Sequence, residues 1–194
     1  AARFIFPRDR DRFIAGRGIL RELLAAYLKE PAATVKFNYG SRGKPRLAPE
    51  APGLRFNLSH SDGIALYAIT KGREVGIDVE RIRPDFGGMA VAERFFSARE
   101  RADLHALPED SRANGFFLCW TEKEAYVKAL GDGLHIPLDS FDVSLAPPAA
   151  GQLRAPDGVI WTLHSFQPAT DFIAAVAGEG TGWQPRFLKY RGSS

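Results

Sequence analysis

The segment EVGIDVE, Glu74 to Glu80, alternates apolar residues with small or acidic ones, and this period of two predicts a β-strand. Asp78 and Glu80 would then share one face, with their Cα atoms about 6.6 Å apart. Two carboxylates at this spacing repel each other unless a cation lies between them, and a hard divalent cation such as Mg²⁺ takes oxygen ligands. The alternative is a solvated strand edge with two surface acids, and the spacing alone does not choose between these interpretations.

A second informative segment is FFLCWTEKEAYVKALG, Phe116 to Gly131, which we expect to be the end of a long helix. Trp120, Glu124 and Lys128 recur every four residues and would share one stripe of that helix. An exposed Glu–Lys pair is the ordinary interpretation. Charges beside an aromatic wall, however, cost free energy unless they are paired or used. Glu124 would supply a third carboxylate to a metal site made with the two strand acids.

Two further segments suit the binding of phosphate groups. In FNLSH, Ser59 and His60 are neighbours at the end of an expected strand, so their side chains point to opposite faces and do not form a nucleophile–base pair. A hydroxyl and an imidazole can instead bind phosphate or ribose, although a lone histidine is more often structural. In SRGKP, Arg42, Gly43 and Lys44 combine glycine with basic side chains, which suits a phosphate clamp, although the Walker A frame is absent.

The chain as a whole predicts an α+β fold. An S-x-x-E capping box, Ser97 and Glu100, marks one helix start, and residues 40–53 are expected to form a loop. The other expected helices are 9–30, 89–96 and 111–130, and the expected strands are 34–39, 54–58, 64–70, 74–80, 140–145, 159–166 and 171–177. A helix followed by strands occurs twice. This indicates a pseudo-twofold pair of similar α+β halves, 1–80 and 81–194, with the active site between them.

Composition excludes several classes of protein. Of the 194 residues, 45% are hydrophobic and 25% are charged, the balance of an ordinary globular protein. The single cysteine, Cys119, excludes an internal disulfide and a cysteine-based zinc site. No apolar run is long enough for a membrane helix and no signal-peptide pattern is found, so we expect a cytoplasmic protein.

Charge is unevenly distributed along the chain. Residues 1–50 hold eleven Lys and Arg against five Asp and Glu, a net of +6, whereas the whole chain carries only +3. The small total does not indicate nucleic-acid binding. The basic start would attract a compact anion such as a nucleotide, or an acidic protein, and the alternative is a solvated basic helix face.

Two motifs in this order carry a family resemblance: GIDVE, Gly76 to Glu80, and about forty residues later WTEKEAYVK, Trp120 to Lys128. Around them lie GKP at 43–45, FNLSH at 56–60, FFS at 95–97 and LDSF at 138–141. The chain resembles the 4′-phosphopantetheinyl transferase superfamily, of the surfactin-synthetase-activating (Sfp) type, over residues 9 to 177. The family's usual first strand, with its basic residues, lies ahead of what this sequence matches, so we assign no contact upstream.

The resemblance implies a reaction and a set of roles. The family moves the 4′-phosphopantetheine arm of coenzyme A onto a serine of a carrier protein and releases adenosine 3′,5′-bisphosphate. By resemblance, Asp78, Glu80 and Glu124 hold Mg²⁺, and Glu124 also activates the serine. Lys128 binds the diphosphate and stabilises the departing charge. In this assignment the catalytic residues are Glu124 and Lys128, the N-terminal half lies on the nucleotide side, and the C-terminal half carries the catalytic helix.

The residues expected to bind coenzyme A form a larger set. They are Arg12, Arg42, Gly43, Lys44, Ser59 and His60, with Asp78 and Lys128 beside the diphosphate. The expected partners are coenzyme A and an acidic acyl or peptidyl carrier protein, with no nucleic acid and no membrane, and we expect a monomer. The rival functions are a Mg²⁺-dependent nucleotide hydrolase and a non-catalytic module that binds coenzyme A or acidic proteins.

Overall fold

A computed structural model of the chain describes residues 7–40, 43–48, 53–131, 136–145, 151–155 and 157–192. The chain divides into two compact units. The first comprises Ala1–Pro52 with Arg186–Ser194, and the second comprises Gly53–Pro185. The predicted halves 1–80 and 81–194 rest on the internal repeat and remain a prediction. The α+β class is confirmed.

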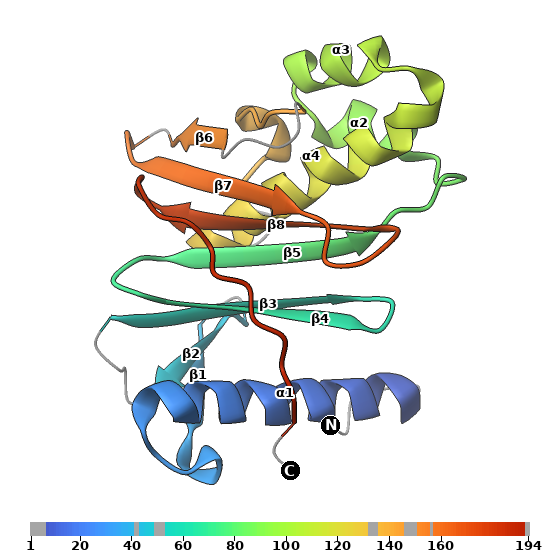
Figure 1. Cartoon of the computed structure of the whole chain (residues 1–194). Helices are drawn as coiled ribbons and strands as arrows, with labels where there is room; N and C mark the ends of the chain where they lie inside the picture. Colours follow the sequence, from blue (N-terminus) through green and yellow to red (C-terminus); the bar gives the residue numbers. More distant parts are fainter. Residues whose placement is uncertain are drawn as a thin grey trace. The chain divides into compact units, whose positions relative to one another are not determined.

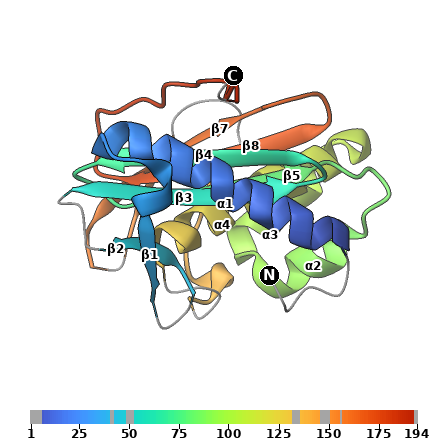
Figure 2. The ribbon, with the colours of Figure 1, turned by 90° about the horizontal axis from the view of Figure 1, so that it is seen from below.

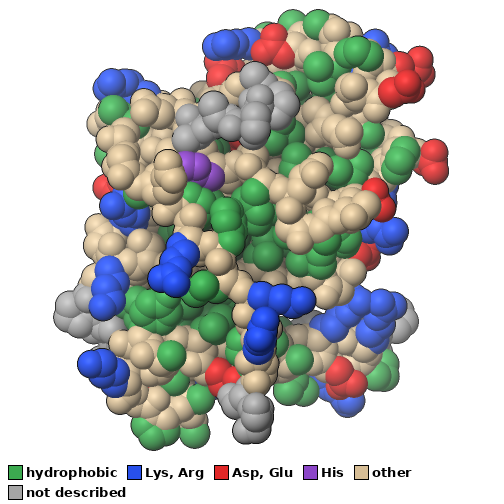
Figure 3. Space-filling model, viewed as in Figure 1, with side chains coloured by type: hydrophobic (Ala, Val, Ile, Leu, Met, Phe, Trp, Pro, Cys, Tyr) green, Lys and Arg blue, Asp and Glu red, His purple; other side chains and the backbone are tan. Residues whose placement is uncertain are grey.

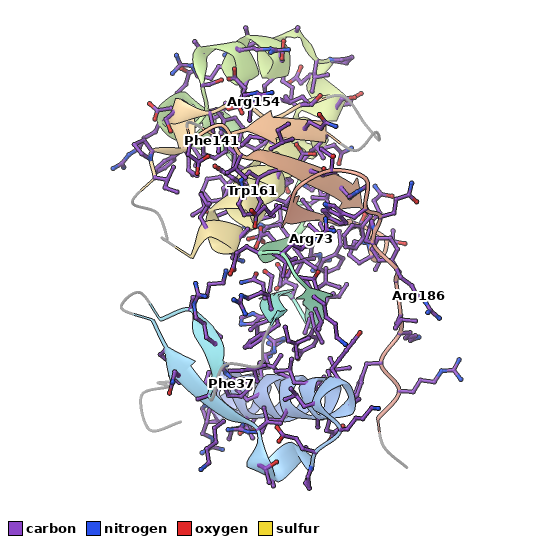
Figure 4. The ribbon with its side chains drawn as sticks, turned by 90° about the vertical axis from the view of Figure 1, so that its left-hand side faces the viewer. Phe37, Arg73, Phe141, Arg154, Trp161 and Arg186 are labelled. Atoms are coloured by element: carbon purple, nitrogen blue, oxygen red, sulfur yellow. The ribbon has the colours of Figure 1, made fainter. Side chains whose placement is uncertain are left out.

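The first unit is built on one long helix. Its elements are α1 (Pro7–Leu28), the 3₁₀ turn η1 (Ala32–Thr34), and the strands β1 (Lys36–Tyr39) and β2 (Pro45–Ala48). In Figure 2 the β1–β2 hairpin extends from the end of α1 at which η1 lies. Arg21 fastens the hairpin to the helix, because its Nε donates to the Val35 carbonyl at 3.2 Å and its guanidinium lies 5.2 Å from the ring of Phe37 (Figure 4).

The prediction of a loop over 40–53 is wrong at β2. This strand pairs antiparallel with β1, from Lys36 opposite Ala48 to Tyr39 opposite Pro45. Pro45 is the first residue of its strand, a position at which the missing N–H costs no ladder hydrogen bond. The proline is therefore compatible with a strand that begins at this residue.

The second unit is a sheet with helices on one side and a hairpin beside it. Its elements are β3 (Leu54–Ser61), β4 (Ile64–Lys71), β5 (Val75–Arg81), α2 (Gly88–Phe95), α3 (Ala98–Ala106), α4 (Glu109–Leu130), η3 (Leu138–Ser140), β6 (Gly151–Arg154), β7 (Ile160–Phe166) and β8 (Phe172–Glu179). An antiparallel sheet has the order β5-β8-β7-β6, and β3 and β4 form a separate hairpin. Helix α4 lies across one face of the four-stranded sheet (Figure 1).

The main core lies between α4 and that sheet. Tyr126 of α4 meets two rings edge-on, those of Phe141 at 4.9 Å and Trp161 at 5.4 Å, both labelled in Figure 4. Cys119 is fully buried in the same core, and burial raises the pKa of its thiol far above the usual range. The thiol is therefore an inert core side chain, as the sequence suggests. No helix in the described ranges is long and apolar enough to cross a membrane.

Most predicted elements are confirmed, but β3 is longer than the expected strand 54–58. It continues through Ser61 and turns at Asp62 and Gly63, both of which have positive φ. A two-residue Asp-Gly turn matches the twist of a hairpin. The segment SHSDG, 59–63, has the composition of a turn, but only Asp62 and Gly63 form it, and Ser59, His60 and Ser61 lie on the strand.

The C-terminal third differs from the prediction in two places. Gly151 and Gln152 end the segment APPAAGQ, which has the composition of a turn, but residues 151–154 form β6 and pair with β7. The expected strand 140–145 is absent, because this segment binds α3 and α4 instead of a neighbouring strand. Lys123 Nζ donates to the carbonyls of Leu138 at 2.5 Å and Phe141 at 2.7 Å, and the Val143 N–H donates to Glu100 Oε1 at 2.8 Å.

These contacts centre on one buried ion pair. Lys123 Nζ lies 2.8 Å from Glu100 Oε1, and both side chains are fully buried. Glu100 also closes the predicted capping box, since its Oε2 accepts the Ser97 N–H at 2.8 Å. The pair joins α3, α4 and the segment after α4, and each hydrogen-bonding group of the ammonium is occupied. Removing one partner would leave an uncompensated buried charge.

We therefore expect Lys123→Met to lower the free energy of unfolding by about 3–5 kcal/mol, the usual result of breaking a buried pair. Urea denaturation followed by tryptophan fluorescence measures this loss. Lys71→Met, at an exposed lysine that ends β4, serves as the control and should change stability by less than about 0.5 kcal/mol. A loss below about 1 kcal/mol for Lys123→Met would show that the pair does not hold this region together.

Gly76 of β5 lies against α4 so closely that no side chain fits. A Cβ atom at this position would come 2.0 Å from the carbonyl oxygen of Ala125 and 2.4 Å from the amide nitrogen of Ala129. Both neighbours are backbone atoms, which cannot rotate away. The glycine therefore sets the distance between β5 and α4.

Gly76→Ala should cost about 3 kcal/mol or more, because it forces the strand and the helix apart. The matched control is Gly151→Ala on β6, where a Cβ would meet no atom within 4 Å and no positive φ is required. Thermal unfolding should show a drop of several degrees for the first variant and none for the second. Equal melting temperatures would contradict the close contact.

Candidate active site

Five polar side chains from three elements meet in the second unit. Strand β3 supplies Ser59, β5 supplies Asp78 and Glu80, and α4 supplies Glu124 and Lys128. The predicted alternation holds on β5, because Gly76 faces α4 and residues 78 and 80 follow on the same face. The tight approach at Gly76 thus brings the two strand acids to the helix. The side chains come from both predicted halves of the chain.

The centre of this group is a hydrogen-bonded triangle. Lys128 Nζ lies 2.5 Å from Asp78 Oδ1 and 3.0 Å from Ser59 Oγ, and Ser59 Oγ donates to Asp78 Oδ1 at 2.8 Å. Asp78 is only 3% exposed, so it is not the solvated surface acid of the alternative interpretation. Lys128 forms its ion pair with Asp78 of β5. It does not pair with Glu124, which lies one turn away on the same helix.

The second oxygen of Asp78 is the feature that suggests a ligand. Asp78 Oδ2 is buried and accepts no hydrogen bond from any described residue. A buried carboxylate oxygen without a partner is costly and rare in folded proteins. Such an oxygen in an acidic cluster suits a bound cation.

The three carboxylates also influence one another. The pKa of Glu124 is raised, first by burial and then by the negative charges of Asp78 and Glu80, while Lys128 opposes the shift. The pKa of Glu80 is raised by burial and by Asp78, against the hydrogen bond from Ser61 and the charge of Lys128. Glu80 and Glu124 are therefore harder to ionise than exposed glutamates. A divalent cation among them would remove this repulsion.

The acids fit Mg²⁺ in chemistry, although they are not a finished cage. In the part of the chain that the structure describes, no three His, Cys, Asp or Glu side chains are already arranged to hold a metal ion. The chemistry of the site nevertheless suits a hard cation. All the ligand atoms are carboxylate oxygens, Asp78 Oδ2 has no hydrogen-bond partner among the described residues, and the negative charges of Asp78 and Glu80 act on Glu124. The residues that would hold it are Asp78, Glu80 and Glu124.

The other predicted binding residues have different positions. His60 is exposed while Ser59 is buried, as expected for adjacent strand residues. Arg12, Gly43 and Lys44 belong to the first unit, where Arg12 is exposed on α1 and Gly43 turns with a φ of 81°. Arg42 lies outside the described residues. Of the residues predicted to bind the nucleotide, Ser59 belongs to the five-residue cluster in the second unit.

Sequence reasoning missed a basic residue on α1. The guanidinium of Arg17 lies over three aromatic rings, those of Phe13 at 5.3 Å, Phe37 at 5.6 Å and Tyr39 at 5.5 Å. Its Nη1 is buried without a hydrogen-bond partner among the described residues. Nothing in the helical pattern distinguishes this arginine from its neighbours, since the rings of Phe37 and Tyr39 come from the strand that the fold places beside it.

Residues 74–177 match the family model of the 4′-phosphopantetheinyl transferase superfamily, and residues 1–71 match the model named 4′-phosphopantetheinyl transferase, N-terminal. The chain belongs to this superfamily. The acids of β5 and the acid and lysine of α4 all lie within the matched segment of this transferase. The resemblance drawn from GIDVE and WTEKEAYVK is thereby confirmed.

Individual relatives agree. The 4′-phosphopantetheinyl transferase HetI of Nostoc sp. (strain PCC 7120 / SAG 25.82 / UTEX 2576) is 45% identical over 192 residues, which are 98% of this chain and 80% of the relative. A 4′-phosphopantetheinyl transferase of Bacillus subtilis is 36% identical over 157 residues, 80% of this chain and 68% of its own length. The transferase Sfp of Bacillus subtilis (strain 168) is 32% identical over 155 residues, 80% of this chain and 67% of its own length.

The triangle of Lys128, Asp78 and Ser59 yields a prediction about stability. Lys128→Met should lower the free energy of unfolding by about 2 kcal/mol, less than for a fully buried pair because the lysine is 31% exposed. Because Mg²⁺ can replace the lost positive charge, 10 mM MgCl₂ should restore more stability to this variant than to the parent protein. Thermal unfolding with and without the salt measures both effects.

The control for this experiment is Asp78→Asn combined with Lys128→Met. With the buried charge also removed, the double variant should lose less stability than the sum of the single losses, and Mg²⁺ should no longer help. Additive losses would show that Lys128 and Asp78 are not energetically coupled.

Proposed function

We propose that this transferase moves the 4′-phosphopantetheine arm of coenzyme A onto a serine hydroxyl of an acyl or peptidyl carrier protein, using Mg²⁺ held by Asp78, Glu80 and Glu124. The observation that carries the metal assignment is the buried Asp78 Oδ2, which has no hydrogen-bond partner among the described residues and lies near Glu80 and Glu124, whose pKa values are raised. When bound, the cation would neutralise charge on the diphosphate of coenzyme A.

Glu124 is the proposed general base. In the reaction the serine oxygen forms a bond to the β-phosphorus, the bond from that phosphorus to the adenosine 3′,5′-bisphosphate oxygen breaks, and the serine proton must leave. Without a cation, burial and the neighbouring acids raise the pKa of Glu124. Bound Mg²⁺ would lower this pKa and keep the carboxylate ionised, which is the form that can accept a proton. It receives the proton directly or through a water molecule.

Lys128 is proposed to stabilise the departing charge. Its ammonium is 31% exposed, so one side of it faces Asp78 and Ser59 while the remainder is open to a substrate. A lysine held by an acid on one side is fixed in position for the diphosphate on the other. Asp78 thereby both faces the metal and orients Lys128.

The nucleotide of coenzyme A is assigned to basic and hydroxyl groups. We assign its phosphates to Arg12, Arg42, Gly43, Lys44 and His60. Ser59 belongs to the same assignment, although its hydroxyl already binds Asp78 and Lys128.

Arg17 extends this assignment, since its Nη1 has no hydrogen-bond partner among the described residues and a guanidinium binds phosphate oxygens well.

An acidic carrier protein fits the distribution of charge. The first 50 residues carry a net charge of +6 within a total of +3. On the face drawn in Figure 3, Lys and Arg side chains lie singly or in small groups, with Asp and Glu side chains beside some of them. Small separated groups of positive charge suit an acidic protein surface, which they can steer into contact.

The deciding experiment incubates the protein with coenzyme A, MgCl₂ and a panel of apo-carrier proteins, and follows intact mass. A gain of one phosphopantetheine arm on a carrier supports transfer. Consumption of coenzyme A without that gain supports the nucleotide hydrolase, and binding without turnover supports a non-catalytic module.

Glu124→Gln should lower the rate of transfer at least about 100-fold, because a metal ligand and the base are lost together. The control is Glu109→Gln, a glutamate in the exposed first turn of the same helix, which should keep the parent rate. Near-normal turnover by Glu124→Gln, with folding intact, would exclude both roles assigned to Glu124.

A further inference from the structure

Strands β3 and β5 run side by side without sharing a backbone ladder. Strand β5 is the edge strand of its sheet, and its backbone pairs on one side with β8. Its other edge faces β3, which pairs through its own backbone with β4 (Figure 1). The contacts run from residue 57 opposite 77 to residue 61 opposite 81, so the two strands are parallel.

Side chains of β3 replace the missing backbone ladder. The Ile77 N–H donates to Asn57 Oδ1 at 3.0 Å, and the Arg81 N–H donates to Ser61 Oγ at 3.3 Å. Both N–H groups lie on the edge of β5 that is turned away from β8. The Ile77 N–H is buried and needs an acceptor, and the side chain of Asn57 supplies it.

The same row of side chains reaches the acids. Ser59 Oγ donates to Asp78 Oδ1 at 2.8 Å, and Ser61 Oγ donates to Glu80 Oε2 at 3.0 Å. Residues 57, 59 and 61 share one face of β3 because they are spaced by two. This face is therefore a row of short polar side chains directed at β5 and at the two acids that β5 carries.

Ser61 has the most specific arrangement in this row. Its oxygen accepts a hydrogen bond from the Arg81 N–H and donates one to the carboxylate of the preceding residue, Glu80. The accepted bond fixes the hydroxyl against the strand, and the donated bond fixes one carboxylate oxygen. Unlike Ser59, Ser61 makes no hydrogen bond to Lys128 among the described contacts.

We infer that Ser61 is a positioning residue that holds the Glu80 carboxylate in the orientation required to bind Mg²⁺. The inference rests on the proposed function, since it assumes that Glu80 is a metal ligand. Groups behind metal ligands fix their orientation, and their loss commonly weakens metal affinity by about 10–100-fold. In this proposal Ser61 acts through the Glu80 carboxylate.

The first test is Ser61→Ala in the full-length protein. Mn²⁺ serves as the probe for the metal site, and calorimetric titration in the presence of coenzyme A without carrier measures its affinity. We expect the dissociation constant to rise about 10-fold. Transfer to a carrier should need about 10-fold more Mg²⁺ for half-maximal rate, with the rate at saturating Mg²⁺ within about twofold of the parent protein.

An isosteric pair separates the hydroxyl from the shape of the side chain. Ser61→Thr keeps the hydroxyl and Ser61→Val replaces it by a methyl group, while both are favourable in a strand. The threonine variant should bind Mn²⁺ as the parent does, and the valine variant should match Ser61→Ala. Amide exchange at Arg81 should be faster in the valine variant than in the threonine variant. This comparison holds even if alanine destabilises the strand.

The matched control is Ser165→Ala on β7. Ser165 Oγ donates to a glutamate carboxylate at 2.6 Å, as Ser61 does, but the acceptor is the buried Glu122 on the core side of α4. Ser165→Ala also removes a hydrogen bond from a strand serine to a glutamate. Because Glu122 is not a proposed metal ligand, the Mg²⁺ concentration needed for half-maximal transfer should not change.

Two results would overturn the inference without affecting the proposed function: unchanged Mn²⁺ affinity in Ser61→Ala while Glu80→Gln weakens it, or a loss of rate that saturating Mg²⁺ does not recover. The proposed metal role would itself be wrong if the parent protein transferred phosphopantetheine equally well in EDTA and if Glu80→Gln changed neither Mn²⁺ affinity nor the rate of transfer. This inference would then fall with it.

Discussion

The contact of β5 with α4 at Gly76 is the constraint on which the site depends. A Cβ there would overlap the backbone of Ala125 and Ala129, so only glycine allows the strand and the helix to approach this closely. Two and four residues later on the same strand face come Asp78 and Glu80. Glu124 and Lys128 are the immediate neighbours of Ala125 and Ala129. The glycine that permits the packing therefore also determines which charges meet.

The α4 segment and β5 could be predicted from the sequence because their patterns are local. The four-residue spacing of Trp120, Glu124 and Lys128 and the two-residue spacing around Asp78 are fixed by helix and strand geometry alone. The motif order then identified the family. The local pattern could not predict the ion-pair partner of Lys128. Glu124 is close to Lys128 in sequence, whereas Asp78, the actual partner, comes close only when α4 packs on β5.

The missed features share a physical cause, which is that their partners are distant in sequence. Ser61 lies in the segment SHSDG, which has the composition of a turn, and its proposed role depends on β3 lying beside β5. The expected strand 140–145 has the right composition, but its backbone groups bind Lys123 and Glu100 instead of another strand. The local sequence does not predict that Lys123 is buried. A lysine is stable inside the core only when it is paired, and its partners, the Glu100 carboxylate and two backbone carbonyls, are distant in sequence.

In the proposed mechanism, the two oxygens of Asp78 allow one carboxylate to bind both a cation and Lys128. Oδ1 accepts from Ser59 and Lys128, whereas Oδ2 has no hydrogen-bond donor among the described residues. A cation bound at Oδ2 does not need to displace the ammonium at Oδ1. The cation and the Lys128 ammonium can then both face a diphosphate. The single negative charge of Asp78 keeps these two positive charges close together. The buried serine hydroxyl at Oδ1 fixes the plane of the carboxylate, so the open oxygen is held in one direction before any ligand binds.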